Sequence, residues 1–161
     1  MEKTNIILIS KRCCTHPVVV VGSIIERNKK LLLVQEGGKW NQPIGWLELR
    51  EDIIDGAKRE TEEETGLKVK ITGFLGVYSL IKDKEGKVLH AIKFIFTAKP
   101  CGEKKNFTTK LKTRWFSYNE IQEMKNKNQL WDPDLPVIID NYLKDKIYPI
   151  EITSNFKIVS E

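Results

Sequence analysis

The strongest constraint on the fold is a change of hydrophobic periodicity in the middle of the chain. Within residues 52–65, Ile54, Ala57 and Thr61 stand three or four positions apart, the spacing of one face of an α-helix. Gly66 follows where a left-handed helix cap belongs. Runs typical of strands lie on both sides, and further helical patterns come last. This order predicts an α/β fold with a mixed sheet covered by helices on both faces.

Five runs rich in β-branched and aliphatic residues are expected to form strands: Val18–Ile25, Leu31–Gln35, Val69–Ile81, Val88–Ala98 and Lys112–Ser117. The polar stretch 26–30 predicts a hairpin between the first two strands, and the turn signal at 83–86 separates the third from the fourth. Asn5–Ile9 is either an extra edge strand or an ordered tail.

Two helices are expected to complete the chain, Asn119–Lys127 and Leu135–Lys144, with a role mainly in packing. The second has Asp134 at the N-cap position and Pro136 in its first turn, where each residue type is favoured. Residues 1–161 show no repeat and no long linker, and we therefore expect a single domain.

Composition narrows the class of protein. Lysine and arginine exceed aspartate and glutamate by 27 − 22 = +5, and this positive charge favours polyanionic substrates. The basic residues are spread along the chain, so nucleic-acid binding is a minority hypothesis. Cys13, Cys14 and Cys101 form no metal or disulfide pattern and fit a reducing cytoplasm. The early apolar run Ile6–Ile9 is too short for a signal peptide or a membrane span, and we expect no membrane association.

Three acidic residues share one face of the central helix. Because each helical residue advances about 100°, Glu60, Glu63 and Glu64 project together beside the apolar stripe. Like charges at this spacing destabilise a helix by roughly 0.2–0.5 kcal/mol per pair, so a cation is expected among them. Converging carboxylates without His or Cys suit Mg²⁺, or Mn²⁺, which keep positions open for substrate phosphate oxygens. The site is predicted to hydrolyse a phosphoanhydride bond with metal-activated water.

Residues 45–67, GWLELREDIIDGAKRETEEETGL, resemble the Nudix box, G-x5-E-x7-R-E-U-x-E-E-x-G-U, where U is a bulky apolar residue. All seven fixed positions match: Gly45, Glu51, Arg59, Glu60, Glu63, Glu64 and Gly66. Thr61 stands where the family usually has an aliphatic residue. The resemblance implies a Nudix-type α/β/α sandwich with its core over roughly residues 17–145.

The resemblance also implies roles for the box residues. Glu60, Glu63 and Glu64 would bind the metal, with support from Glu51, and Gly45 would offer its backbone carbonyl. Arg59 would orient the carboxylates and complete the catalytic set. Family members often add an acid from a later segment, but residues 104–112 contain none, and neither Glu103 nor Glu120 has a convincing spacing. We therefore place proton removal within the box.

Three aromatic residues are candidates for contacts with a substrate base. Trp40 and Trp46 flank the entry to the box, and Tyr78 lies on a strand beyond it. Each has an alternative role in core packing.

Trp40-Asn41-Gln42-Pro43 and Tyr148-Pro149 resemble the small bacterial Nudix phosphatases that act on nucleoside di- and triphosphates and on a thiamine-precursor diphosphate. The expected substrate is thus a small nucleotide or other diphosphate. ADP-ribose hydrolysis and the removal of mutagenic nucleotides are alternatives. A catalytically silent nucleotide-sensing module and an RNA-decapping enzyme are rivals from other classes, and the sequence leaves a homodimer open.

Overall fold

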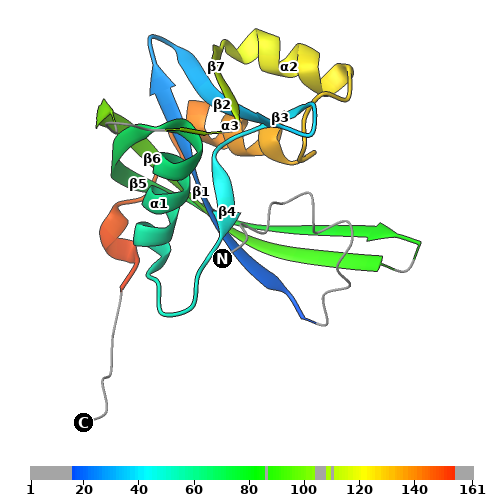
Figure 1. Ribbon diagram of the computed structural model, residues 1–161. Coiled ribbons are helices and arrows are strands. Elements are labelled where there is room, and N and C mark those ends of the chain that lie inside the picture. The colour runs from blue at the N-terminus through cyan, green and yellow to red at the C-terminus, as the bar shows by residue number, and fades with distance from the viewer. Residues whose placement is uncertain (1–15, 86, 104–107, 110, 155–161) are drawn as a thin grey trace.

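A computed structural model describes residues 16–85, 87–103, 108–109 and 111–154 (Figure 1). The strands within these residues are β1 (Val18–Arg27), β2 (Lys30–Glu36), β3 (Lys39–Asn41), β4 (Ile44–Trp46), β5 (Leu67–Lys84), β6 (Lys87–Glu103) and β7 (Lys112–Phe116). The helices are α1 (Ile53–Thr65), α2 (Tyr118–Asn126), α3 (Leu135–Leu143) and the short 3-10 helix η2 (Ile150–Ile152). The predicted class, α/β with a mixed sheet, is confirmed.

Strand β1 is the centre of the sheet. It runs parallel to β6 from Val18 to Ile25 and antiparallel to β4, while β5 pairs antiparallel with β6 along almost its whole length. β2 leaves β1 after two residue pairs and continues between β3 and β7. The sheet therefore divides near β4, and α1 begins shortly after that strand.

Helices cover both faces of the sheet. Successive β1 side chains point to opposite faces, and those on each face pack against helices. Val20 and Ile24 belong to a core cluster that also contains residues of α2 and α3, whereas Val21 packs with Ala57 of α1. The arrangement is the expected α/β/α sandwich, and its layers can be followed in Figure 1. None of the helices among the described residues has both the length and the apolar character needed to cross a membrane.

Both ends of α1 are fixed by local sequence. The Asp52 side chain accepts hydrogen bonds from the backbone N–H groups of Ile54 (2.8 Å) and Asp55, so it caps the N-terminus. Gly66 has φ of 74° and ends the helix in the left-handed conformation, as predicted. Thr61 is fully buried and takes the place of the usual aliphatic residue.

The other predicted elements are confirmed, with small shifts in their ends. The hairpin strands β5 and β6 are longer than predicted. α2 and α3 each lie within one residue of the expected bounds, and they contribute the buried side chains Ile121, Met124, Leu135, Ile138 and Ile139. Asn5–Ile9, for which an edge strand or an ordered tail was expected, lies outside the described residues.

Two features differ from expectation. The short strands β3 and β4 were not predicted, although the turn Gly37-Gly38, with φ of 55° and 83°, is a recognisable hairpin signal between β2 and β3. Asp134 does stand at the N-cap position of α3, but its side chain makes no capping bond. Its carboxylate instead binds Lys93, 41 residues away, because a buried ammonium needs a charged partner.

Candidate active site

Arg59 joins the loop before α1 to the helix itself. Its Nε and Nη2 donate to the two carboxylate oxygens of Glu51, at 2.6 and 2.8 Å, and Nη2 also donates to the backbone carbonyl of Trp46 at 3.0 Å. Two parallel bonds to one carboxylate fix the plane of the guanidinium. This bonding lowers the pKa of the Glu51 carboxyl, which stays ionised.

The same guanidinium contacts two glutamates of the helix. Its Nη1 lies 2.5 Å from Glu60 Oε1 and 3.7 Å from Glu63 Oε2. Arg59 and the three carboxylates that it contacts, Glu51, Glu60 and Glu63, form what we call the Arg59 cluster. Its formal charge is +1 − 3 = −2.

Glu60 lies against the backbone of β4. A Cβ atom at Gly45 would stand 2.1 Å from the Glu60 carboxyl carbon, so a larger residue there would displace the Glu60 carboxylate from this position. Burial raises the pKa of the Glu60 carboxyl, Arg59 opposes this rise, and the negative charges of Glu63 and Glu51 add to it. A second cation beside this carboxylate would favour its ionised form and so lower its pKa again.

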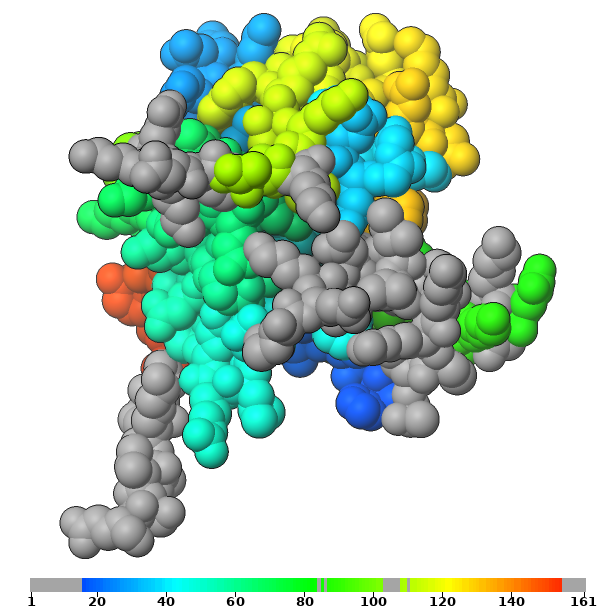
Figure 2. Space-filling model, in the orientation of Figure 1, coloured from blue at the N-terminus to red at the C-terminus, as the bar shows by residue number. Residues whose placement is uncertain are grey.

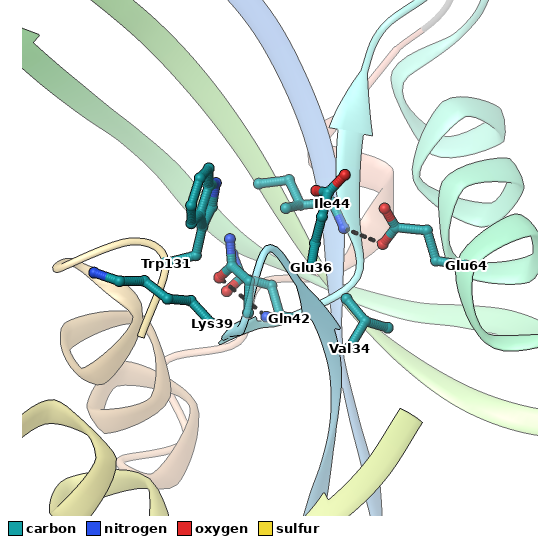
Figure 3. A pocket seen from close by; sticks show the side chains of 8 residues that line it. Val34, Glu36, Lys39, Gln42, Ile44, Glu64 and Trp131 are labelled. Carbon is teal, nitrogen blue, oxygen red and sulfur yellow. Dashed lines mark hydrogen bonds between the residues drawn. The ribbon is translucent and has the colours of Figure 1, made fainter. Parts of the chain in front are cut away.

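Glu64, at the end of α1, reaches β4 at a different point. Its Oε2 accepts a hydrogen bond from the backbone N–H of Ile44 at 3.1 Å (Figure 3). Glu62, two residues earlier, points elsewhere and accepts a bond from the Val69 N–H near the start of β5. Glu60, Glu63 and Glu64 therefore line the β4 side of α1, whereas Glu62 does not.

The three predicted metal ligands bind protein groups in this arrangement. Across the described residues, no group of three or more His, Cys, Asp or Glu side chains is placed to hold a metal ion. Their oxygens nevertheless have the chemistry that a hard divalent cation requires. In Figure 2 α1, coloured teal, lies at the surface of the molecule. The side chains of Glu60 and Glu63 are 15% and 35% exposed, so solvent reaches both carboxylates.

A pocket lies next to Glu64 (Figure 3). It is a small, partly open depression whose interior, about 10 Å³, has room for roughly one water molecule. The residues around it come from β2, β3, the link between β3 and β4, β4, α1 and the loop before α3: Val34, Glu36, Lys39, Asn41, Gln42, Ile44, Glu64 and Trp131. A ligand in this pocket would therefore contact one of the predicted metal ligands directly.

The aromatic residues predicted to contact a base lie elsewhere. Trp40, Trp46 and Tyr78 all pack against the core cluster shared with α2 and α3, and none of them lines the pocket beside Glu64. Trp40 meets the Phe116 ring edge-on at 4.7 Å, and the Tyr78 hydroxyl accepts a bond from Asn141. The geometry favours packing for all three, and their contact with substrate stays a prediction.

Of the two acids considered outside the box, Glu120 does not join the site. Glu120 accepts bonds from the Ser117 backbone N–H and hydroxyl, at 2.7 and 2.9 Å, and thereby caps α2. Glu103 ends β6, and its side chain lies outside the described part of the structure.

Comparison with known proteins identifies the family. Residues 15–137 match the model of the NUDIX domain, which is more than half of the chain. This chain belongs to the Nudix family. Its box residues thus occupy the loop–helix–loop that the Nudix pattern describes.

The relatives of this Nudix protein are phosphatases and hydrolases. The phosphatase NudJ of Escherichia coli strain K12 is 30% identical over 144 residues, which cover 87% of this chain and 92% of NudJ. A Nudix hydrolase from Nitrosomonas europaea has a similar structure, with a TM-score of 0.77 and 29% identity over 88% of this chain and 98% of that one. A MutT protein from Bacillus halodurans gives a TM-score of 0.62 and 28% identity, covering 76% and 80% of the two chains.

These matches make the chain a Nudix hydrolase, an enzyme family that acts on small nucleotide substrates and generally uses divalent cations. Motif reading found the box but missed the pocket beside it. Glu36 and Trp131 stand in no periodic pattern or motif, and Gln42 was noted only within Trp40-Asn41-Gln42-Pro43, without a role in a pocket. A further signal was the Gly37-Gly38 turn, which brings β3 back toward the box.

Proposed function

We propose that this Nudix hydrolase uses Mg²⁺, or Mn²⁺ in its place, to cleave a phosphoanhydride bond in a nucleoside di- or triphosphate or in a nucleoside diphosphate derivative. The observation that carries the proposal is the Arg59 cluster, a set of four charged groups with a surplus of negative charge at the spacing of an intact Nudix box. Glu64 lies on the same side of the helix and borders a pocket.

The residues have distinct roles in this proposal. Glu60, Glu63 and Glu64 bind the metal together with the backbone carbonyl of Gly45, and Glu51 supports them. The bound cation would neutralise phosphate charge and lower the pKa of a water molecule. Arg59 acts as a catalytic-site residue that holds Glu51 and Glu60 in place through three hydrogen bonds, and a fourth joins it to the backbone carbonyl of Trp46.

Proton removal belongs to a carboxylate of the box. Within the described residues Glu120 caps α2 and does not join the site, which supports an assignment within the box. The absence of a nucleophilic Ser, Cys or His from the described box region is consistent with direct attack by water.

A substrate panel tests the proposal. Nucleoside di- and triphosphates, ADP-ribose, dinucleoside polyphosphates, capped RNA and thiamine-pathway diphosphates are incubated with the full chain and Mg²⁺, and phosphate and pyrophosphate are measured separately. We expect turnover of at least one nucleotide, abolished by EDTA and restored by Mg²⁺ or Mn²⁺. Turnover that survives EDTA would contradict metal dependence, and no turnover of any compound would favour the silent sensing module.

The panel also separates the alternatives for substrate. Preference for ADP-ribose would identify an ADP-ribose pyrophosphatase. Release of pyrophosphate from oxidised nucleoside triphosphates, at rates above those for the ordinary nucleotides, would identify a sanitising enzyme. Release of nucleotide from capped RNA would identify a decapping enzyme.

A further inference from the structure

The segment Trp40-Asn41-Gln42-Pro43 leads from β3 directly into β4. β4 in turn meets two of the predicted metal ligands. The backbone N–H of Ile44 donates to Glu64 at 3.1 Å, and Gly45 lies against the Glu60 carboxyl group (Figure 3 shows the bond to Glu64). Contacts that fix this segment therefore also fix the backbone that two box glutamates meet.

β4 has few contacts of its own that could fix it. It contains three residues, and within the described structure it pairs with one strand, β1, through three residue pairs. β2 leaves β1 after two residue pairs and does not pair with β4. A backbone bond of 3.0 Å from the Ser23 N–H to the Pro43 carbonyl adds one anchor. The position of so short a strand depends on the residues that lead into it.

The Asn41 side chain forms hydrogen bonds in two directions. Its Oδ1 accepts from the backbone N–H of Gln42 at 3.0 Å, and its Nδ2 donates to Asp132 Oδ2, 91 residues later in the chain, at 3.0 Å. Asn41 is 5% exposed, so water does not readily replace either partner. Aspartate at this position would lack the donor, and leucine would lack both groups.

Asp132 gives Asn41 a fixed partner. Its carboxylate binds the ammonium groups of Lys93 at 2.8 Å and Lys82 at 2.7 Å, and Lys93 is buried in the middle of the sheet. The backbone of Trp40 adds two bonds, of 2.9 and 2.8 Å, to the same loop before α3. Asn41 thus joins the start of β4 to a part of the fold that is held by several independent contacts.

We propose that Asn41 is a positioning residue for the metal site. Its two hydrogen bonds hold the backbone that leads into β4, so that the Ile44 N–H stays where it binds Glu64. Asn41 acts through this backbone and does not itself contact metal or substrate. The inference rests on the proposed function for the role of Glu64 as a metal ligand, whereas the effect on the Ile44 backbone is independent of any reaction.

Amide hydrogen exchange of the metal-free chain measures the position of the Ile44 N–H directly. Asn41→Leu keeps roughly the size of the side chain and removes both bonds. The Ile44 amide should then exchange at least about tenfold faster, the scale of one lost hydrogen bond. The amide of Met124 in α2 reports any loss of overall stability, and it should change less. An equal change at both amides, or no change at Ile44, would overturn the inference.

Electron paramagnetic resonance of free Mn²⁺ measures the consequence at the metal site. Asn41→Leu should bind Mn²⁺ about tenfold more weakly than the parent chain, the lower end of the effect of changing the support of a metal ligand. The matched control is Tyr142→Phe, which also removes a donor to a carboxylate, that of Glu26, and should bind Mn²⁺ like the parent chain. Parent-like Mn²⁺ affinity in folded Asn41→Leu would overturn the inference.

Asn41→Ser is a second variant, because the buried position makes folding of Asn41→Leu a necessary check by circular dichroism. Serine removes the amide donor to Asp132 and keeps one oxygen close to the backbone. It should show the same two effects, and it decides the result if Asn41→Leu does not fold. Failure of the parent chain to bind Mn²⁺ would count against the proposed function as well, whereas equal Mn²⁺ binding by the parent chain and the Asn41 variants would count against this inference alone.

Discussion

Two clusters of charged side chains in this protein differ in net charge. In the Arg59 cluster one guanidinium contacts three carboxylates, whereas in the cluster we call the Lys93 cluster two ammonium groups, Lys82 and Lys93, contact two carboxylates, Asp132 and Asp134. The Lys93 side chain is 2% exposed and that of Arg59 is 22% exposed. The buried cluster is neutral, and the more accessible one is negative.

The difference separates structure from function. Neutrality allows the Lys93 cluster to remain inside the fold, where an unpaired charge is strongly unfavourable. Although burial opposes it, the ammonium groups of Lys93 and Lys82 hold the pKa of the Asp132 carboxyl below its ordinary value. The Arg59 cluster has a net negative charge where solvent reaches it, and a site for an exchangeable cation requires both properties.

Removing the buried ammonium should give the largest change in stability. Lys93→Met leaves Asp134 without its ammonium partner and Asp132 with Lys82 alone, and removal of one partner from a buried pair costs about 3–5 kcal/mol. Denaturant unfolding measures the loss. A variant as stable as the parent protein would show that the Lys93 cluster is not an internal charge pair that the fold needs.

Neutralising one glutamate of the box should affect the reaction and spare the fold. Glu63→Gln or Glu64→Gln is expected to reduce kcat by at least about 10²-fold, the scale for a positioned acid or base. The matched control is Glu62→Gln, since that carboxylate faces Val69 on the other side of the helix. Steady-state kinetics with the best substrate of the panel would refute the site if both variants kept near-normal activity.

Divalent cations should stabilise the folded protein by binding on the side of α1 that carries the Arg59 cluster. At a Mg²⁺ concentration ten times the dissociation constant, binding to the folded state alone adds about 1.4 kcal/mol. A thermal melt should therefore shift upward with Mg²⁺ in the parent chain and in Glu62→Gln, and much less in Glu64→Gln. A melting temperature independent of Mg²⁺ would argue against a preformed site.

The exposed member of the Lys93 cluster should matter least. Lys82 is 37% exposed, and although it lies 2.7 Å from Asp132, exposed pairs typically contribute about 0–1 kcal/mol. Lys82→Met should therefore destabilise the fold far less than Lys93→Met. Similar losses of unfolding free energy in the two variants would mean that burial does not determine how much each lysine contributes to stability.

The elements that sequence predicted well depend on local signals. The ends of α1 follow from Asp52 and Gly66, which act within one helical turn, and the α2 and α3 bounds follow from similar local patterns. The box residues were recognised for the same reason, because their spacing lies within one short segment. The contact of Glu63 with Arg59 follows from their i, i+4 spacing on the helix, whereas that of Glu51 depends on the loop before α1.

The features that sequence missed depend on long-range contacts. Asp134 looked like a helix cap, and only the structure brings it to Lys93 on β6. The pocket needs β2, β3, α1 and the loop before α3 together, so Glu36 and Trp131 carry no signal in the sequence alone. Trp40 was singled out for its place before the box, yet its ring packs on Phe116.

Direct titration of Mn²⁺ tests the metal site without any assumption about substrate. Electron paramagnetic resonance of free Mn²⁺ measures how much of the ion each folded protein binds. We expect the parent chain and Glu62→Gln to bind Mn²⁺ alike, and Glu63→Gln and Glu64→Gln to bind it at least about tenfold more weakly, the scale on which a loss of about 1.4 kcal/mol is felt. Equal binding by all four proteins would contradict a metal site on this face of α1.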